Sequence, residues 1–256
     1  MESDRCFSEE SDLCQAALEQ NLFPGDLIIE IGRFFLGAPY QTDTLEAAGR
    51  ERLIINLAEF DCTTFVETVL ALTRCAAAGK LSPSEFRKYL KFIRYRQAKI
   101  DDYASRLHYF TDWLRDNEKK KVLRDVTRLF NGKPKRKKIN FMTMHRELYA
   151  GLKNEEQLGK MLLVEENLSR RAFYIIDRDK VARMQSAIQQ GDIIAFATDQ
   201  EGLDVAHVGF AVRQGRQLHL LHASSKEGAV IISKETLPAY LKFNKKFTGI
   251  LVARFL

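Results

Sequence analysis

The sequence of 256 residues predicts an α+β fold, with a helical N-terminal half packed on a mostly antiparallel sheet from the C-terminal half. Apolar residues recur at helical spacing in the first two thirds of the chain, whereas short strand-like segments follow beyond Arg171. Helices first and strands afterwards favour α+β over the alternating α/β class. No repeat or linker interrupts the chain, so we expect a single domain over residues 1–256.

Helical patterns cover most of the first half. The strongest begins at Cys62, because Asp61 can cap it and apolar residues follow up to the stop signal at Gly79. Ser82 and Pro83 open another helix, with a capping residue and a proline in the first turn. The predicted helices are 11–21, 25–36, 62–78, 82–94, 108–115, 142–149, 155–168 and 179–189, and 53–57 is a short extended run.

Strand-like segments fill most of the last third, separated by turns that contain Gly, Asp or Lys. One of them begins near His207 and contains Gly209, and a glycine inside a strand often marks a close approach of two backbones. The predicted strands are 172–176, 192–197, 206–213, 217–222, 229–232 and 247–255.

The composition excludes several classes of function. The hydrophobic fraction of 45% and the charged fraction of 29% are those of an ordinary globular protein, and no apolar run is long enough to span a membrane. The net charge of +6 favours anionic partners only weakly, since the basic run 133–138 follows the turn signal Asn131-Gly132 and is expected to be a solvated loop. No nucleic-acid-binding module is recognisable, so we expect no nucleic-acid partner.

The four cysteines, Cys6, Cys14, Cys62 and Cys75, have spacings that match no zinc or redox pattern, and we predict no metal and no cofactor. Cys75 is expected to be a small buried residue. Residues 1–5 are polar and lack the apolar core of a signal peptide. The protein is therefore expected either to be cytoplasmic or to begin at the start of a processed form.

Cys62 is the candidate nucleophile. Asp61 caps the helix with its carboxylate, and Cys62 then lies where the helix dipole is most positive, which favours the thiolate. The backbone amide of Cys62 could also donate to a developing oxyanion. The alternative from this segment alone is a capped helix with a buried cysteine.

His207 is the candidate base, because it begins an apolar strand. If this strand and the next pair as a hairpin, His222 can approach His207 and orient it as the third member of a triad. Strand alternation places His219 on the opposite face, so His222 is preferred and His219 is the fallback.

These residues carry a family resemblance. Asp-Cys-Thr opening a helix, Gly-Asp before a strand, His-Val-Gly and His-Ala-Ser follow one another as in the NlpC-like branch of papain-fold cell-wall hydrolases. The chain more narrowly resembles the cysteine N-acetylmuramoyl-L-alanine amidases. That resemblance rests on residues 35–40 with 44–46, 56–72, 105–113, 191–212 and 221–225.

The resemblance implies a papain-like/NlpC-like fold, with an N-terminal helical extension (1–36) and helical insertions (about 100–170). It implies a muropeptide substrate whose N-acetylmuramoyl-L-alanine amide is cleaved by Cys62, His207 and His222. Its cell-wall substrate suggests the cell envelope or periplasm. Substrate contacts are expected from Tyr40, Arg106, His108, Tyr109 and Trp113, although core packing is the alternative for Tyr109 and Trp113.

Other readings remain open. A γ-D-glutamyl-diamino acid endopeptidase would use the same Cys62 and His207 with a different pocket. A zinc hydrolase would need His207, His219 and His222 as ligands, without the usual ligand spacing. A non-catalytic binding domain is disfavoured because Cys62 and His207 are both in place. Thr63-Thr64 replaces the Ser-Gly that follows the cysteine in much of the superfamily, which favours the amidases.

Overall fold

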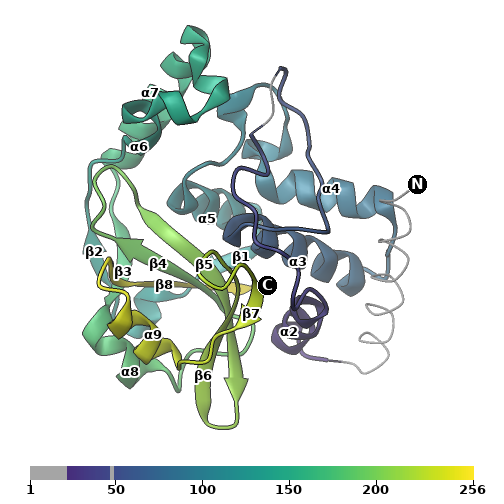
Figure 1. Cartoon of the computed structure of the whole chain (residues 1–256), viewed down its shortest axis with the longest axis vertical. Helices are drawn as coiled ribbons and strands as arrows, with labels where there is room; N and C mark the ends of the chain where they lie inside the picture. The colour runs from purple at the N-terminus through teal and green to yellow at the C-terminus, as the bar shows by residue number, and fades with distance from the viewer. Residues whose placement is uncertain (1–21, 47–48) are drawn as a thin grey trace.

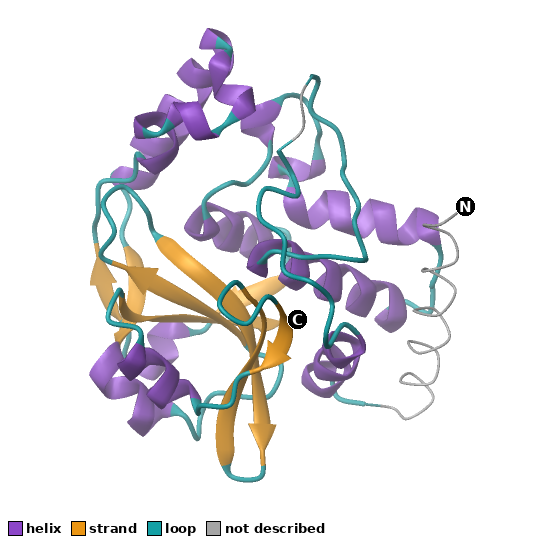
Figure 2. Cartoon of the chain, viewed as in Figure 1, coloured by secondary structure: helices purple, strands orange, loops and turns teal. Residues whose placement is uncertain are grey.

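The structure, a computed structural model, describes residues 22–46 and 49–256. It is a mixed α+β fold in which a twisted sheet has helices on both faces (Figures 1 and 2). The predicted helix 11–21, Cys6 and Cys14 lie outside the described residues.

The strands form one sheet in the order β2-β3-β8-β4-β5-β6-β7, and β1 also pairs with β8. Every strand pair is antiparallel, which confirms the predicted type of sheet. The predicted strands all occur, whereas the three-residue strands β1 and β2 were not foreseen. The bounds are β1 (Leu123–Asp125), β2 (Lys133–Lys135), β3 (Phe173–Asp177), β4 (Ile193–Thr198), β5 (Val205–Gln214), β6 (Gln217–Ser224), β7 (Ala229–Ile232) and β8 (Phe247–Phe255).

Most predicted helices also occur, and the differences are local. The predicted helix 142–149 is a four-residue helix followed by a 3₁₀ turn, the predicted helix 179–189 is similarly shortened, and the run 53–57 forms no strand. Helix α9 was not predicted. The bounds are α2 (Pro24–Phe34), α3 (Cys62–Ala77), α4 (Pro83–Arg94), α5 (Phe110–Lys119), α6 (Phe141–Met144), α7 (Glu155–Ser169), α8 (Val181–Met184) and α9 (Leu237–Phe243).

Helix α3 is the central helix of the larger core. Residues all round it are buried, as a helix enclosed by other elements requires. Phe65 packs edge to face against Phe210 of β5, with ring centroids 5.9 Å apart. Because these residues follow Cys62 and His207 by three positions each, this contact fixes the start of α3 against β5.

The opposite face of the sheet is covered by α8 and α9 (Figure 1). There Tyr240 of α9 packs on Phe196 of β4 and Phe247 of β8. A third cluster joins α6 and α7 to the segment before α5, where Glu165 accepts a hydrogen bond from the hydroxyl of Tyr109 at 2.6 Å.

Two further expectations concern the surface and the core. Cys75 is fully buried, as predicted. The basic run is only partly a solvated loop, because Lys133–Lys135 form β2 and the ammonium of Lys137 donates to the carbonyls of Thr198, Gln200 and Leu203. Lys137 thereby closes the turn between β4 and β5. Within the described residues, no helix has both the length and the apolar character needed to cross a membrane.

Candidate active site

Cys62 is the first residue of α3, and Asp61 caps that helix as predicted. The carboxylate of Asp61 accepts from the backbone amides of Thr63 and Thr64 at 2.9 and 2.7 Å. The hydroxyl of Thr64 in turn accepts from the amide of Asp61 at 3.0 Å, which completes a capping box. The two threonines after the cysteine therefore hold the helix start in a defined geometry.

The β5–β6 hairpin brings two histidines together. Phe210 pairs with Leu221, so His207 and His222 are diagonal neighbours on one face of the sheet. The Nε2 atom of His207 lies 2.6 Å from the Nδ1 atom of His222. Gly209 permits this approach, because a Cβ at that position would lie 2.8 Å from the Cβ of His222.

Both imidazoles are held in the neutral form. Burial, with smaller contributions from His222 and Lys246, lowers the pKa of His207 well below its ordinary value. Burial also lowers the pKa of His222 to about 4. The Nε2 atom of His222 is buried and has no hydrogen-bond partner within the part of the chain that the structure describes.

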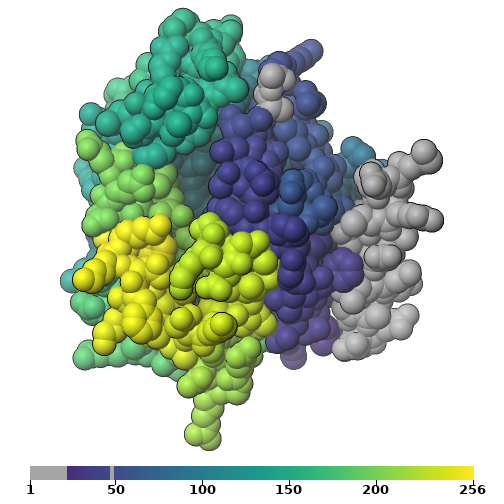
Figure 3. All heavy atoms as spheres, viewed as in Figure 1, coloured from purple at the N-terminus to yellow at the C-terminus, as the bar shows by residue number. Residues whose placement is uncertain are grey.

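Cys62 and His207 line the same cavity, which has a volume of about 110 Å³. Helix α3 and strand β5 meet there, since the backbone amide of Val208 hydrogen-bonds to the thiol of Cys62. In Figure 3 this face of the molecule is hollowed between residues of the 37–60 segment, in purple, and the teal and green segments beside them. The predicted nucleophile and base are thus brought to one cavity.

The thiol of Cys62 is neutral, contrary to the thiolate that the helix dipole led us to expect. Burial and the nearby carboxylate of Asp61 raise its pKa to about 12. Hydrogen bonds from the amide of Val208 and from Thr63 oppose this rise without reversing it. The resting pair is therefore a thiol and a neutral imidazole, and a thiolate forms only when the proton is transferred.

Tyr40 lies close to the thiol. Its backbone amide donates to the carbonyl of Gly228 at 2.8 Å, and it bridges to Phe60 just before α3. Burial and the proximity of Cys62 and Asp61 raise the pKa of its phenol to about 12. The phenol therefore keeps its proton and can act as a hydrogen-bond donor beside the reactive sulfur.

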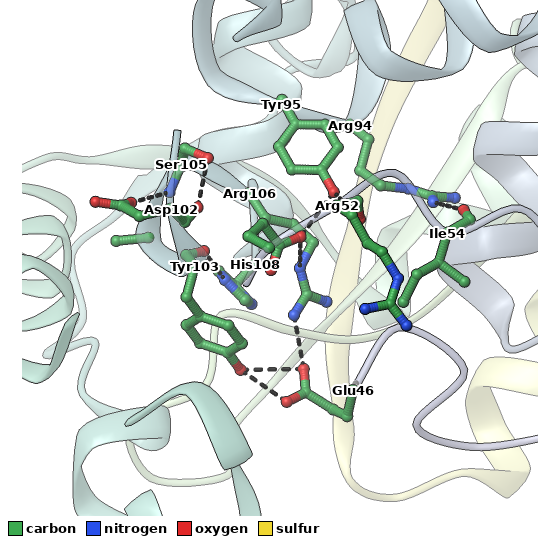
Figure 4. A network of polar contacts seen from close by, with 12 residues as sticks. Glu46, Arg52, Ile54, Arg94, Tyr95, Asp102, Tyr103, Ser105, Arg106 and His108 are labelled. Atoms are coloured by element: carbon green, nitrogen blue, oxygen red, sulfur yellow. Dashed lines mark hydrogen bonds and ion pairs between the residues drawn. The ribbon is translucent and has the colours of Figure 1, made fainter. Parts of the chain in front are cut away.

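Arg106 and His108 belong to a polar network that borders a second cavity of about 190 Å³ (Figure 4). The guanidinium of Arg106 contacts Glu46 at 2.8 Å and Glu51 at 3.3 Å, so protein carboxylates already occupy it. His108 Nε2 lies 2.8 Å from the carbonyl of Tyr103. Because a carbonyl only accepts, Nε2 donates and Nδ1 of this neutral imidazole is an acceptor.

Tyr109 and Trp113 lie in the core, with 2% and 1% of their surface exposed. The hydroxyl of Tyr109 donates to Glu165 and accepts from the amide of Met142 at 2.9 Å. The indole of Trp113 donates to Glu67 at 3.0 Å. These contacts describe packing, and the two side chains also border the cavities, Trp113 that of Cys62 and Tyr109 the second one.

His219 is separated from the other two histidines. It lies on the opposite face of β6, where its Nδ1 is 2.9 Å from the carbonyl oxygen of Ser233. The three imidazoles therefore do not converge as a zinc site requires. Over residues 22–46 and 49–256, no group of three His, Cys, Asp or Glu side chains could hold a metal ion.

Two residues near the site were not singled out from the sequence. Asp204 is buried and accepts from the amide and hydroxyl of Thr111, both at 2.7 Å, which ties the turn before β5 to α5. The ring of Tyr240 packs edge to face on His222 with centroids 5.5 Å apart. Neither had a local signal, because each partner lies far away in the sequence.

Solved structures of other proteins share the fold of this chain. An N-acetylmuramoyl-L-alanine amidase from Bacteroides uniformis is 42% identical, with a TM-score of 0.87 and coverage of 91% of this chain and 99% of that one. A Bacteroides fragilis protein provisionally named a xylanase is also 42% identical, with a TM-score of 0.83 and coverage of 88% and 98%. A Legionella pneumophila protein shares the fold at 22% identity, with a TM-score of 0.77 and coverage of 99% and 95%.

No match is found among the curated proteins. A family model described as N-acetylmuramoyl-L-alanine amidase-like matches residues 30–250, which is most of the chain. The chain belongs to this AmiA-like family.

Proposed function

We propose that the protein is a cysteine-dependent amide hydrolase that cleaves the bond between N-acetylmuramic acid and L-alanine in peptidoglycan fragments. The observation that carries the proposal is the shared cavity of Cys62 and His207, together with the contact between Nε2 of His207 and Nδ1 of His222. Family membership supports the amidase class. We assign the fold to the NlpC-like branch of the papain superfamily, and its single domain to residues 1–256.

The reaction begins with a proton transfer, because the resting pair is neutral. Nε2 of His207 is engaged with His222, which leaves Nδ1 to accept the thiol proton as the sulfur attacks the lactyl carbonyl. For this the His207 proton must sit on Nε2 and point at His222 Nδ1. His222 thus selects the tautomer and the ring orientation that the base requires.

The tetrahedral oxyanion then needs donors. The backbone amide of Cys62 lies at the positive N-terminal end of α3, and the phenol of Tyr40 keeps its proton beside the sulfur. We assign both as oxyanion or substrate donors. Collapse of the intermediate breaks the C–N bond, and His207 returns its proton to the departing amine of L-alanine.

The muramoyl group is left as a thioester on Cys62. Water attacks that thioester with His207 as the base, which releases the muramic carboxylate and regenerates the thiol. The second cavity, where Arg106 and His108 lie, adjoins the first through Thr63 and Leu107 and offers room for the remainder of the substrate. Such a substrate would place the enzyme in the cell envelope.

Mass analysis of the products from a defined muramoyl peptide tests the bond. An intact N-acetylmuramic acid together with a free peptide that begins with L-alanine is the expected result. The runner-up, a γ-D-glutamyl-diamino acid endopeptidase, would instead leave L-Ala-D-Glu on the sugar. That product would contradict the amidase assignment while retaining the cysteine mechanism.

The xylanase name of the Bacteroides fragilis protein suggests a different chemistry, which the site does not favour here. Glycosidases use a pair of carboxylic acids on either side of the glycosidic bond. In this chain the cavity of Cys62 and His207 contains one carboxylate, Asp204, and its oxygens are already hydrogen-bonded to Thr111 and to the amide of Val205. A sugar-release assay on xylan is therefore expected to show no activity.

A further inference from the structure

Strand β8 lies inside the sheet, where it pairs with β4 along one side and with two different short strands along the other. Its C-terminal part pairs with β1, from Leu123↔Phe255 to Asp125↔Ala253, and its N-terminal part pairs with β3 at Ile176↔Ile250 and Asp177↔Gly249. The sheet therefore forks on this side of β8, next to Leu251. Helix α5 and the end of α7 border the fork, and a cavity of about 460 Å³ lies there.

This cavity is separate from the catalytic one. Phe110 and Trp113 of α5 line the cavity of Cys62, whereas Thr111, Leu114 and Arg115 of the same helix line the cavity at the fork. The two cavities therefore lie on different faces of α5.

Four arginines surround the cavity at the fork, namely Arg115, Arg124, Arg128 and Arg171. All four are exposed, and none has a carboxylate oxygen within 4.0 Å in the ranges that the structure describes. The two acidic residues of the lining are tied to backbone amides: Glu118 accepts from Asp125 at 3.0 Å, and Asp125 accepts from Thr127 at 2.9 Å. The guanidinium charges outnumber the carboxylates, so the cavity has a positive potential.

The floor of the cavity is apolar. Leu114, Leu168 and Leu251 are buried, and Phe173 and Tyr174 of β3 add aromatic surface. The guanidinium of Arg128 lies over the ring of Tyr174, 4.7 Å from its centroid. This contact orients the N–H donors of Arg128. The volume is within the range of small-molecule sites, and a few polar groups over an apolar floor are typical of them.

We propose that this cavity binds a small organic phosphate, with its phosphate groups on the arginines and its apolar or aromatic part on the floor. Guanidinium groups match phosphate oxygens with two parallel hydrogen bonds, which is why arginine predominates at such sites. The apolar floor favours this ligand class over inorganic phosphate, because inorganic phosphate has no apolar part to contact the floor.

Calorimetric titration of the full chain with ATP in EDTA, and with inorganic pyrophosphate and adenosine, tests the proposal. We expect ATP to bind with a Kd of about 10⁻⁴ M or tighter, and pyrophosphate and adenosine each to bind at least about tenfold more weakly. The double variant Arg128→Ala/Arg171→Ala should weaken ATP binding at least about tenfold, because it removes charge-assisted contacts.

The matched control is Arg87→Ala/Arg216→Ala, which removes the same charge from exposed positions away from the cavity. It should leave ATP binding unchanged, and circular dichroism should show both double variants folded. Failure of ATP to bind, an equal loss in the control, or equal binding of ATP and pyrophosphate would each overturn the proposal. Turnover of a muramoyl peptide should be the same in both double variants, so this result is independent of the amidase assignment.

Discussion

The Nε2 atom of His207 lies 2.6 Å from the Nδ1 atom of His222, across the diagonal of the β5–β6 hairpin. His207 therefore has a single ring nitrogen left to exchange a proton with the thiol. Replacing His222 with alanine should lower kcat by about 10²-fold, because the base loses its fixed tautomer. Steady-state kinetics on a muramoyl peptide measures this effect.

His219→Ala is the control for that variant. His219 is on the same strand and is also buried, but its ring bonds to the carbonyl of Ser233 on the other face. A kcat near that of the unmodified enzyme is expected once the folded fraction is taken into account. An equal loss of kcat in both variants would show that His222 has only a structural role.

A substitution at Gly209 tests the contact between His207 and His222 through the backbone. A Cβ there would lie 2.8 Å from both the Cβ of His222 and the carbonyl oxygen of Leu221, so Gly209→Ala must displace β6 or the imidazole. We expect a lower kcat and a loss of about 1–3 kcal/mol in the free energy of unfolding. Gly159→Ala in α7 meets no atom within 4 Å, so it should preserve kcat and raise the free energy of unfolding by up to about 1 kcal/mol, because alanine favours a helix over glycine.

The pH dependence of kcat/KM follows from the neutral resting pair. The active form requires a neutral His207, and burial holds its pKa well below 6.5. Activity should therefore persist as the pH falls through 6.5 and decline only when His207 gains a proton at more acidic pH. An acid limb at or above pH 6.5 would contradict the burial of the base.

Asp61 has two separable effects, on the helix and on the thiol. Asp61→Asn keeps an oxygen that accepts from the amides of Thr63 and Thr64 but removes the charge that raises the pKa of Cys62. Iodoacetamide should therefore react faster with this variant at a fixed pH near neutrality. Asp61→Ala should in addition lower the free energy of unfolding by about 1 kcal/mol, through loss of the cap.

Asp43→Asn provides the control for the alkylation rates. Asp43 is exposed and carries the same charge, but it acts on the pKa of Tyr40 and not on that of Cys62. An alkylation rate close to that of the unmodified protein is expected. Slower alkylation of Asp61→Asn would refute the electrostatic effect assigned to Asp61.

Local patterns in the sequence predict the parts of the site that depend on local structure. The cap of Asp61 and the start of α3 at Cys62 follow from residue types next to one another. The pairing of His207 with His222 follows from a two-strand hairpin, where spacing alone decides which side chains share a face.

Other features depend on partners that lie far apart in the chain. No local pattern indicates that the hydroxyl of Tyr109 donates to Glu165 or that the indole of Trp113 donates to the distant Glu67. The charge state of Cys62 was misjudged for a related reason. The dipole of α3 is a local property, whereas the burial that outweighs it results from the packing of β5 on the helix.

The central claim is that Cys62 is the nucleophile, and turnover of a defined muramoyl peptide by Cys62→Ser tests it most directly. Cys75→Ala serves as the comparison, since Cys75 is buried in the same helix away from the cavity. We predict that Cys62→Ser loses at least about 10³-fold in kcat while remaining folded, and that Cys75→Ala keeps most of its activity. Full turnover by folded Cys62→Ser would contradict the cysteine mechanism.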